Sequence, residues 1–167
     1  MPVTFSPADT FLVLAALLFS WAALEDVRHL RIPNWIPLCL CGVFFVHSLM
    51  SANADNLSGA LIVGGGLLVV GIILFSLGWL GGGDGKLIAA AGLYAGPAML
   101  AEFALVTTVV GGGLALIFLS PARPVLSWFA LQANAPHLSE TLNGNRLPYA
   151  VAIAAGACVV LVTLIQA

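Results

Sequence analysis

Two aspartates, Asp26 and Asp84, combine a reactive side chain with a setting that could support chemistry. Each lies beside a long apolar run, and a charge at the centre of a bilayer costs roughly 2.5–3.5 kcal/mol on insertion scales. Two carboxylates in close proximity cannot both stay ionised, so they share a proton. The ionised one can then take a proton from water while the protonated one hydrogen-bonds a peptide carbonyl. This is the chemistry of an aspartic protease.

The surroundings of Asp84 favour that chemistry over a purely structural role. Residues 81–86 read Gly-Gly-Gly-Asp-Gly-Lys. Glycine adopts unusual backbone angles and has no side chain that would block an extended substrate. The run is not a phosphate-binding loop, because it lacks that loop's spacing and its Lys-Ser/Thr ending. The structural alternative is that each aspartate is an interfacial charge or a helix cap, with Arg28 or Lys86 as its partner.

The composition shows what kind of element must carry these residues. The chain has 167 residues, of which 61% are hydrophobic and only 7% charged, whereas a soluble domain carries about a quarter charged residues. Lipid is therefore the expected solvent for most of the chain. The net charge of −2 gives no electrostatic case for nucleic acid as a partner. Cys39, Cys41 and Cys158 lie in apolar runs without zinc-type spacing, so neither a metal nor a cofactor is expected.

Six apolar segments are predicted to span the membrane as helices of a single domain covering residues 1–167. The fold class is thus an all-α polytopic membrane protein. The first segment is expected to be a retained span rather than a cleaved signal peptide, because no Lys or Arg precedes it and it ends in Glu25-Asp26 rather than a small-residue cleavage site. The predicted spans are residues 10–27, 34–50, 57–77, 86–95, 99–119 and 147–165. In the polar loop 120–146, residues 125–131 are predicted either as an interfacial helix or as a plain connection.

The basic residues predict an orientation for these six segments. All five Lys and Arg residues fall in the loops after the first, third and fifth segments, and they are Arg28, Arg31, Lys86, Arg123 and Arg146. The positive-inside rule then puts these loops in the cytoplasm and both termini outside it. The same topology brings Asp26 and Asp84 to the cytoplasmic face.

Three motifs, in order along the chain, carry a resemblance to a known family. The run Gly81-x-Gly83-Asp84-x-Lys86 resembles the GxGD motif of intramembrane aspartic proteases. Asp26, followed six residues later by Ile-Pro-Asn at 32–34, is similar to the other half of the bacterial prepilin peptidase signature. Residues 146–150, Arg-Leu-Pro-Tyr-Ala, are similar to the start of that family's last span. The chain is therefore identified as a relative of the prepilin peptidases, with a bundle of the GxGD protease type.

The resemblance implies roles for individual residues. Asp26 and Asp84 would be the catalytic pair. Lys86 would tune the local field or bind lipid headgroups, or else act only as a charge anchor. Gly81 and Gly83 would shape the turn before Asp84. Pro33 and Asn34 would end the first connection and start the second span. Arg146, Pro148 and Tyr149 would support the site. Glu25 would touch a basic substrate or remain a solvated charge, and His29 would hydrogen-bond near the site.

The resemblance also implies the substrate and the setting. Prepilins have a short basic leader in the cytoplasm and an apolar helix in the membrane, and the leader would be attracted to the carboxylates. Larger relatives carry a zinc-binding insertion linked to N-methylation, which this chain lacks, so we expect a peptidase-only form of the Flp, tight-adherence type in the bacterial inner membrane. The competing hypotheses are a small proton-coupled transporter and a non-catalytic subunit of a pilus or secretion assembly.

Overall fold

The helices of the computed structural model confirm the all-α class. Residues 7–51, 54–120 and 147–166 are described, and within these ranges the chain forms helices and no strands. Four helices are long and apolar enough to cross a membrane, and α2, with 16 residues, is a shorter apolar helix. The helices are α1 (Asp9–His29), α2 (Trp35–Met50), α3 (Ala54–Ser76), α4 (Gly82–Leu119) and α7 (Tyr149–Gln166). The segment predicted at 125–131 lies outside the described residues.

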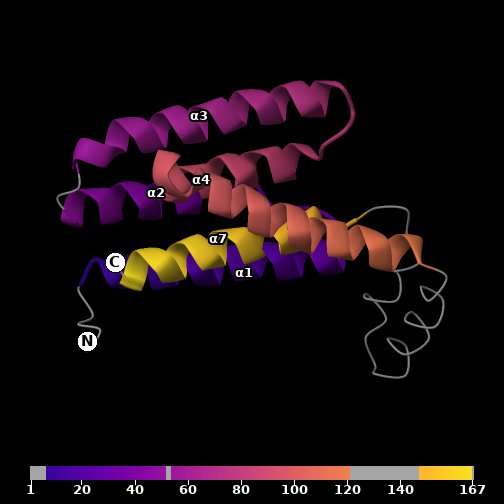
Figure 1. The fold of residues 1–167 in the computed structure, drawn as a ribbon, viewed down its shortest axis with the longest axis horizontal. Coiled ribbons are helices and arrows are strands. Elements are labelled where there is room, and N and C mark those ends of the chain that lie inside the picture. Colours follow the sequence, from indigo (N-terminus) through magenta and orange to yellow (C-terminus); the bar gives the residue numbers. More distant parts are fainter. Residues whose placement is uncertain (1–6, 52–53, 121–146, 167) are drawn as a thin grey trace.

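The expected count of six separate helices is not confirmed, because the segments predicted at 86–95 and 99–119 form the two arms of one element, α4, which meet at a kink. A straight helix of 38 residues would be about 57 Å long, close to twice the ~30 Å of a bilayer's hydrocarbon core. The helix is not straight. Gly96 has φ 53° and ψ −169° inside it, and Pro97 follows. A positive φ favours glycine, and proline has no N–H to continue the hydrogen-bond ladder. Figure 1 shows α4 bending sharply, so that its second arm turns back along the bundle.

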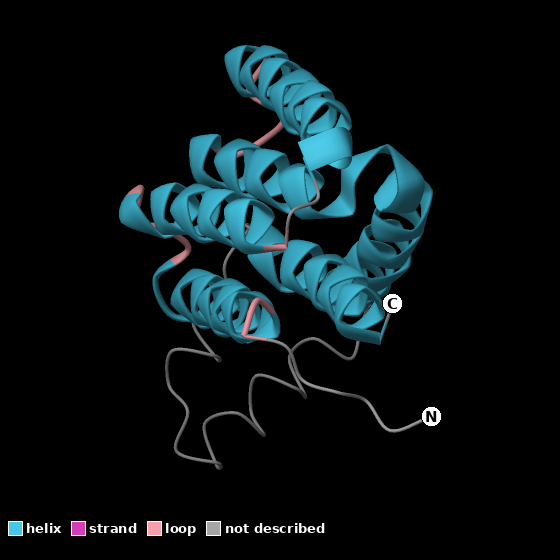
Figure 2. Cartoon of the chain, turned by 90° about the vertical axis from the view of Figure 1, so that its left-hand side faces the viewer, coloured by secondary structure: helices cyan, strands magenta, loops and turns pink. Residues whose placement is uncertain are grey.

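The helices alternate in direction along one axis of the bundle. In Figure 1, α1 begins and α7 ends at the left, whereas α1, α3 and the second arm of α4 end at the right. The starts of α2, α4 and α7 lie at this same right-hand end, so the connections next to Asp26 and Asp84 meet there. Helix α7 packs against both α1 and α4, while α3 packs mainly on α4 and barely touches α2. Figure 2 also shows α3 at the outer edge of the bundle.

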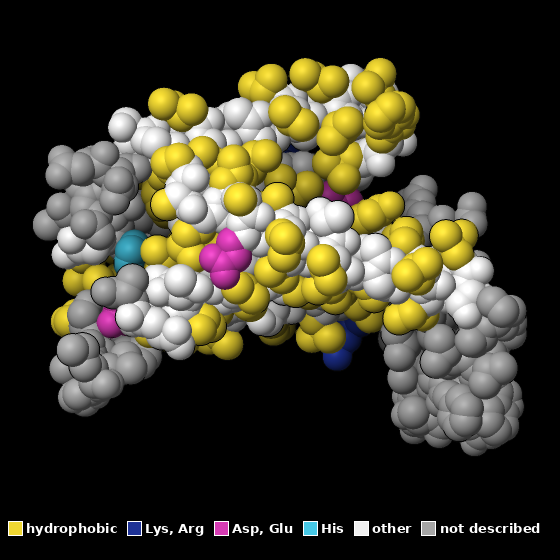
Figure 3. Space-filling view, viewed as in Figure 1, with side chains coloured by type: hydrophobic (Ala, Val, Ile, Leu, Met, Phe, Trp, Pro, Cys, Tyr) yellow, Lys and Arg dark blue, Asp and Glu magenta, His cyan; other side chains and the backbone are white. Residues whose placement is uncertain are grey.

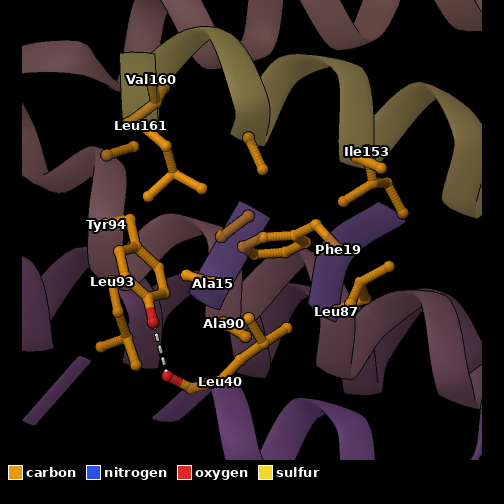
Figure 4. Packing of buried hydrophobic residues seen from close by; sticks show 14 of the residues in the cluster. Ala15, Phe19, Leu40, Leu87, Ala90, Leu93, Tyr94, Ile153, Val160 and Leu161 are labelled. Atoms are coloured by element: carbon orange, nitrogen blue, oxygen red, sulfur yellow. Dashed lines mark hydrogen bonds between the residues drawn. The ribbon is translucent and has the colours of Figure 1, made fainter. Parts of the chain in front are cut away.

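The core joins α1, α2, α4 and α7 in the middle of the bundle (Figure 4). Tyr94 is the polar member of this core, and its hydroxyl donates a hydrogen bond of 2.8 Å to the carbonyl of Leu40. Its ring meets Phe19 edge to face with centroids 6.0 Å apart, a preferred aromatic geometry. The largest fully buried side chains are those of Leu12, Phe19, Ile36, Leu40, Leu87, Ile153, Val160 and Leu161. These contacts fix the helices whose ends carry the two aspartates.

The outer surface carries many large apolar side chains. Figure 3 shows hydrophobic side chains spread across the visible face. Leu17 of α1 is 63% exposed, Ile62 of α3 is 74% exposed and Leu116 of α4 is 72% exposed. A soluble monomer rarely exposes apolar patches of this extent. The molecule is therefore a membrane protein, with helix faces suited to lipid.

Candidate active site

Asp26 continues the buried stripe of α1. The buried residues of this helix are spaced three and four positions apart, which places them on one face, and they are Leu12, Ala15, Phe19, Ala22 and Asp26. Asp26 is only 6% exposed and is the one buried charged side chain among the described residues. The helix ends three residues later, where Leu30 adopts a left-handed conformation and its N–H bonds to the Asp26 carbonyl at 2.9 Å. The carboxylate thus faces the bundle rather than lipid.

The Asp26 carboxylate is held by the first turn of α7. Its Oδ2 accepts a hydrogen bond of 3.0 Å from the backbone N–H of Ala150. The first N–H groups of a helix have no partner within the helix, and they carry a partial positive charge that stabilises an anion. The predicted support from the last span thus comes from a backbone group of Ala150. Pro148 is buried beside it and Tyr149 is exposed, while Arg146 lies outside the described residues.

Asp84 occupies the first turn of α4. Gly81 is the N-cap residue, with extended backbone angles, and it donates a backbone hydrogen bond to the Asp84 carboxylate. A side chain at the third helical position that reaches back to the N-cap N–H forms one half of a capping box. The other carboxylate oxygen, Oδ1, is buried and has no hydrogen-bond partner among the described residues.

The two carboxylates interact electrostatically. They come from chain positions far apart and meet at the right-hand end of the bundle in Figure 1, where α1 ends and α4 begins. Each makes a helix-capping contact, as the structural alternative expected, Asp26 on α7 and Asp84 on α4. The cap does not explain why Oδ1 of Asp84 is buried without a partner. Burying an oxygen in this way costs about 1–3 kcal/mol of stability. Oδ1 of Asp84 therefore has a hydrogen-bonding capacity that no described residue uses.

The two halves of the motif touch each other directly. A Cβ atom added to Gly83 would lie 2.9 Å from the Cβ of Ile32, so the α1–α2 connection packs against the backbone of α4. Lys86 Nζ also donates a hydrogen bond of 2.8 Å to Oδ1 of Asn34. Asn34 is the N-cap residue of α2, but its side chain makes no capping bond there. Pro33 lies in the same connection, and its carbonyl accepts the N–H of Ile36 at 3.1 Å.

One contact of the site was missed by the sequence analysis. Gly85, next to Asp84, packs against Gly71 of α3, where an added Cβ at Gly71 would lie 3.0 Å from the Cα of Gly85. The close approach of two helices through small residues is common in membranes. The glycines at positions 71 and 85 were the only sequence signal for this contact. The residues around each glycine do not indicate that the two face each other.

The remaining ionisable candidates are placed less centrally. Glu25 and His29 contact each other one turn apart, with His29 Nδ1 and Glu25 Oε2 at 2.8 Å. Glu102 is exposed on the second arm of α4. Within the described ranges, no group of three or more His, Cys, Asp and Glu side chains could hold a metal ion. Carboxyl groups such as those of Asp26 and Asp84 can donate and accept protons.

Replacing Gly81 by alanine should move the Asp84 carboxylate without unfolding the bundle. The new Cβ would lie 2.6 Å from Oδ2 of Asp84, and this oxygen ends a side chain that can rotate away. We expect the activity of the site to fall about tenfold, since catalysis depends on position, and the free energy of unfolding to change by about 1 kcal/mol or less. Gly112→Ala is the matched control, because its Cβ meets nothing within 4 Å. Full activity in Gly81→Ala would contradict the importance of this carboxylate position.

The fold and the site define a helical membrane protein with a pair of interacting carboxylates at one end of its bundle. The chain belongs to the type IV leader peptidase family, whose family model matches residues 12–116. This range includes Asp26, the connection to α2 and the whole first turn of α4. The protein is therefore a peptidase. Comparisons with curated proteins and with solved structures gave no significant match.

Proposed function

We propose that this protein is an aspartic endopeptidase that removes the basic leader from Flp-like type IV prepilins at the cytoplasmic face of the bacterial inner membrane. The observation that carries the proposal is the interacting pair Asp26 and Asp84 in a member of a leader peptidase family. One buried oxygen of Asp84 has no hydrogen-bond partner among the residues that the structure describes.

The proposed reaction uses both carboxyl groups and one water molecule. The ionised carboxylate takes a proton from water, and the water oxygen adds to the scissile carbonyl carbon. The protonated carboxyl gives its proton to the carbonyl oxygen, which produces a neutral tetrahedral diol. When the diol collapses, the carbon–nitrogen bond breaks and the nitrogen takes the proton held by the first carboxyl. The second carboxylate takes a hydroxyl proton, so both groups return to their starting states.

The contacts of the two groups support different roles within this reaction. The hydrogen bond from Ala150 at the start of α7 stabilises a negative charge on Asp26, which suits the base that activates water. No described residue hydrogen-bonds to the Oδ1 oxygen of Asp84, which suits an acid that must hydrogen-bond a substrate carbonyl. Gly81 leaves room for the other carboxylate oxygen, Oδ2, and Gly83 lets the α1–α2 connection approach through Ile32. The Lys86–Asn34 bond also joins this connection to α4.

The charges near the site support the proposed orientation and substrate. Arg28 and Arg31 are exposed next to the end of α1, as the positive-inside rule requires of a cytoplasmic face, and both termini would lie on the other side. Asp26, Asp84 and Glu25 would attract a basic leader. A proton-coupled transporter is supported less well, because a relay needs acids near the middle of the membrane, whereas both acids lie at one end of the bundle.

Reconstituted cleavage tests both the activity and its independence of metal. The purified protein in lipid vesicles should convert an Flp-like precursor to its mature form, as seen by mass spectrometry, with the same rate after treatment with a chelator. A peptidase that uses only carboxylates needs no bound metal. The new N-terminus should carry no methyl group even when a methyl donor is supplied. Loss of cleavage with chelator would exclude the two-carboxylate reaction, and a methylated product would exclude the peptidase-only form.

A further inference from the structure

A lateral groove lies between α2, α3 and α4 and begins at the candidate active site. It has a volume of about 450 Å³, and each helix contributes one face to its lining. The lining residues are Asn34, Pro37, Leu38 and Cys41 of α2; Leu61, Gly64, Gly65 and Leu68 of α3; and Lys86, Ala89, Ala90 and Leu93 of α4. Asn34 and Lys86 are the polar members, and they are the residues that hydrogen-bond to each other. The rest of the lining consists of apolar residues and two glycines.

The groove opens sideways, because α3 is held by α4 and scarcely contacts α2. Figures 1 and 2 both show α3 at the outer edge of the bundle, and Figure 3 shows the surface hollowed between α3 and the helices below it. Leu38, on the α2 side, is 71% exposed. A molecule within the membrane could therefore enter from the lipid without passing through water.

An exposed glycine at the edge of the groove favours a helix as its occupant over a lipid chain. Gly64 of α3 is buried against Leu93 of α4, and Ala89 and Ala90 are buried in the floor of the groove, whereas Gly65 is exposed. Small residues let the backbone of another helix approach closely, which is how helices associate within membranes. A flexible acyl chain needs no such flat surface.

The polar end of the groove sets the position of this helix along the membrane. Lys86 follows Asp84 by two residues, about 3 Å along a helix axis. An apolar helix in the groove, ending near Lys86, would therefore place the residues beyond its end next to the Asp84 carboxylate. Those residues are where a leader joins the apolar helix of a precursor.

We propose that this groove binds the apolar membrane helix of the precursor while the junction before that helix is cut. The inference rests on the proposed function, and it assigns the substrate's helix to α2, α3 and α4 rather than to any other face of the bundle. Binding through the groove would fix which peptide bond reaches the carboxylates, because the helix cannot slide past Asn34 and Lys86 without exposing apolar side chains to water.

Two adjacent glycines give a matched test. An added Cβ meets nothing within 4 Å at Gly65 or at Gly66, so both positions accept a larger side chain, but only Gly65 lines the groove. Gly65→Leu should slow cleavage of the full precursor about tenfold, equal to about 1.4 kcal/mol, mainly through KM. Gly66→Leu should not. A short water-soluble peptide that spans the junction should be cut equally by both variants and by the unaltered protein.

Three results of this comparison would overturn the groove as the binding site. These are unchanged cleavage of the precursor by Gly65→Leu, equal impairment by the two leucine variants, and equal impairment of the short peptide and the precursor by Gly65→Leu. If the unaltered protein cleaves neither substrate, the proposed function fails, and the groove is then judged by binding alone.

Native cysteines provide that binding test. Cys41 lines the groove and Cys39, on the same helix, does not. A protein that retains only Cys41 should crosslink to a precursor with a single cysteine in its apolar helix, and one that retains only Cys39 should not. Absence of a Cys41 crosslink, which a lipid occupant would give, overturns the proposal. So does a Cys41–Cys41 dimer formed without precursor, which would indicate that a second copy fills the groove.

Discussion

Asp84→Asn is expected to abolish peptide cleavage and to leave the bundle folded. An asparagine has the same shape and can still accept the hydrogen bond from Gly81 through its carbonyl oxygen. It cannot exchange a proton with substrate or water. Loss of a general acid or base costs about 10²–10⁴ in rate, so cleavage in reconstituted vesicles should fall below detection in most assays. Glu102→Gln is the control, since it neutralises an exposed acid on the second arm of the same helix.

The corresponding changes at Asp26 separate its chemical role from its structural one. Asp26→Asn should also abolish cleavage, but it keeps an acceptor for the N–H of Ala150 and should unfold at nearly the same temperature as the unaltered protein. Asp26→Ala leaves that N–H buried without a partner. Its free energy of unfolding should therefore be lower than that of Asp26→Asn by about 1–3 kcal/mol. Efficient cleavage by either asparagine variant would contradict the two-carboxylate mechanism.

Gly83→Ala is expected to reduce cleavage by about 10²-fold, the loss associated with misplacing reacting groups by about 1 Å. The new methyl group would lie 2.9 Å from the Cβ of Ile32. This Cβ is fixed to the backbone of the α1–α2 connection, so it cannot rotate away as the Asp84 carboxylate can. The connection and the first turn of α4 must therefore separate, and the two carboxylates separate with them. Cleavage rates and thermal unfolding of the purified variant measure the effect.

Changes at Ile32 show whether this contact is the cause. In the Gly83→Ala background, Ile32→Ala keeps the clashing Cβ and should restore little activity. Ile32→Gly removes that Cβ and should restore at least part of the lost activity. Equal rescue by the two changes, or rescue by neither, would mean that Gly83 is needed for a reason other than its contact with Ile32.

The sequence was sufficient to predict the elements that depend on local pattern. The all-α class follows from the apolar runs, and the site's general location follows from the polar breaks at 30–34 and 81–86 together with the alternation of helices. Even the break in α4 was visible in Gly96-Pro97. Two helices do meet there, at the non-helical angles of Gly96, but the join is a kink of a single residue, so both belong to the element α4.

The contacts that build the site could not be predicted in the same way. The bond between Asp26 and Ala150, the bond between Asn34 and Lys86 and the approach of Gly71 to Gly85 all join different helices. Such contacts depend on how helices are rotated and how deeply they interlock, and the short-range periodicity of a nearly uniform apolar chain carries little information on either. Asn34 illustrates the point, because its position predicts an N-cap, while its side chain bonds to α4 instead.

The hydrogen bond between Asp26 and α7 has a consequence for the order in which the enzyme is made. The two bonded residues are 124 positions apart in the chain, and a ribosome produces the Asp26 end first. Until α7 has been synthesised and has inserted beside α1, the carboxylate lacks the N–H that holds it and α1 lacks one of its main packing partners. A nascent chain without α7 therefore lacks this contact, and under the proposed mechanism it becomes competent only when α7 has inserted.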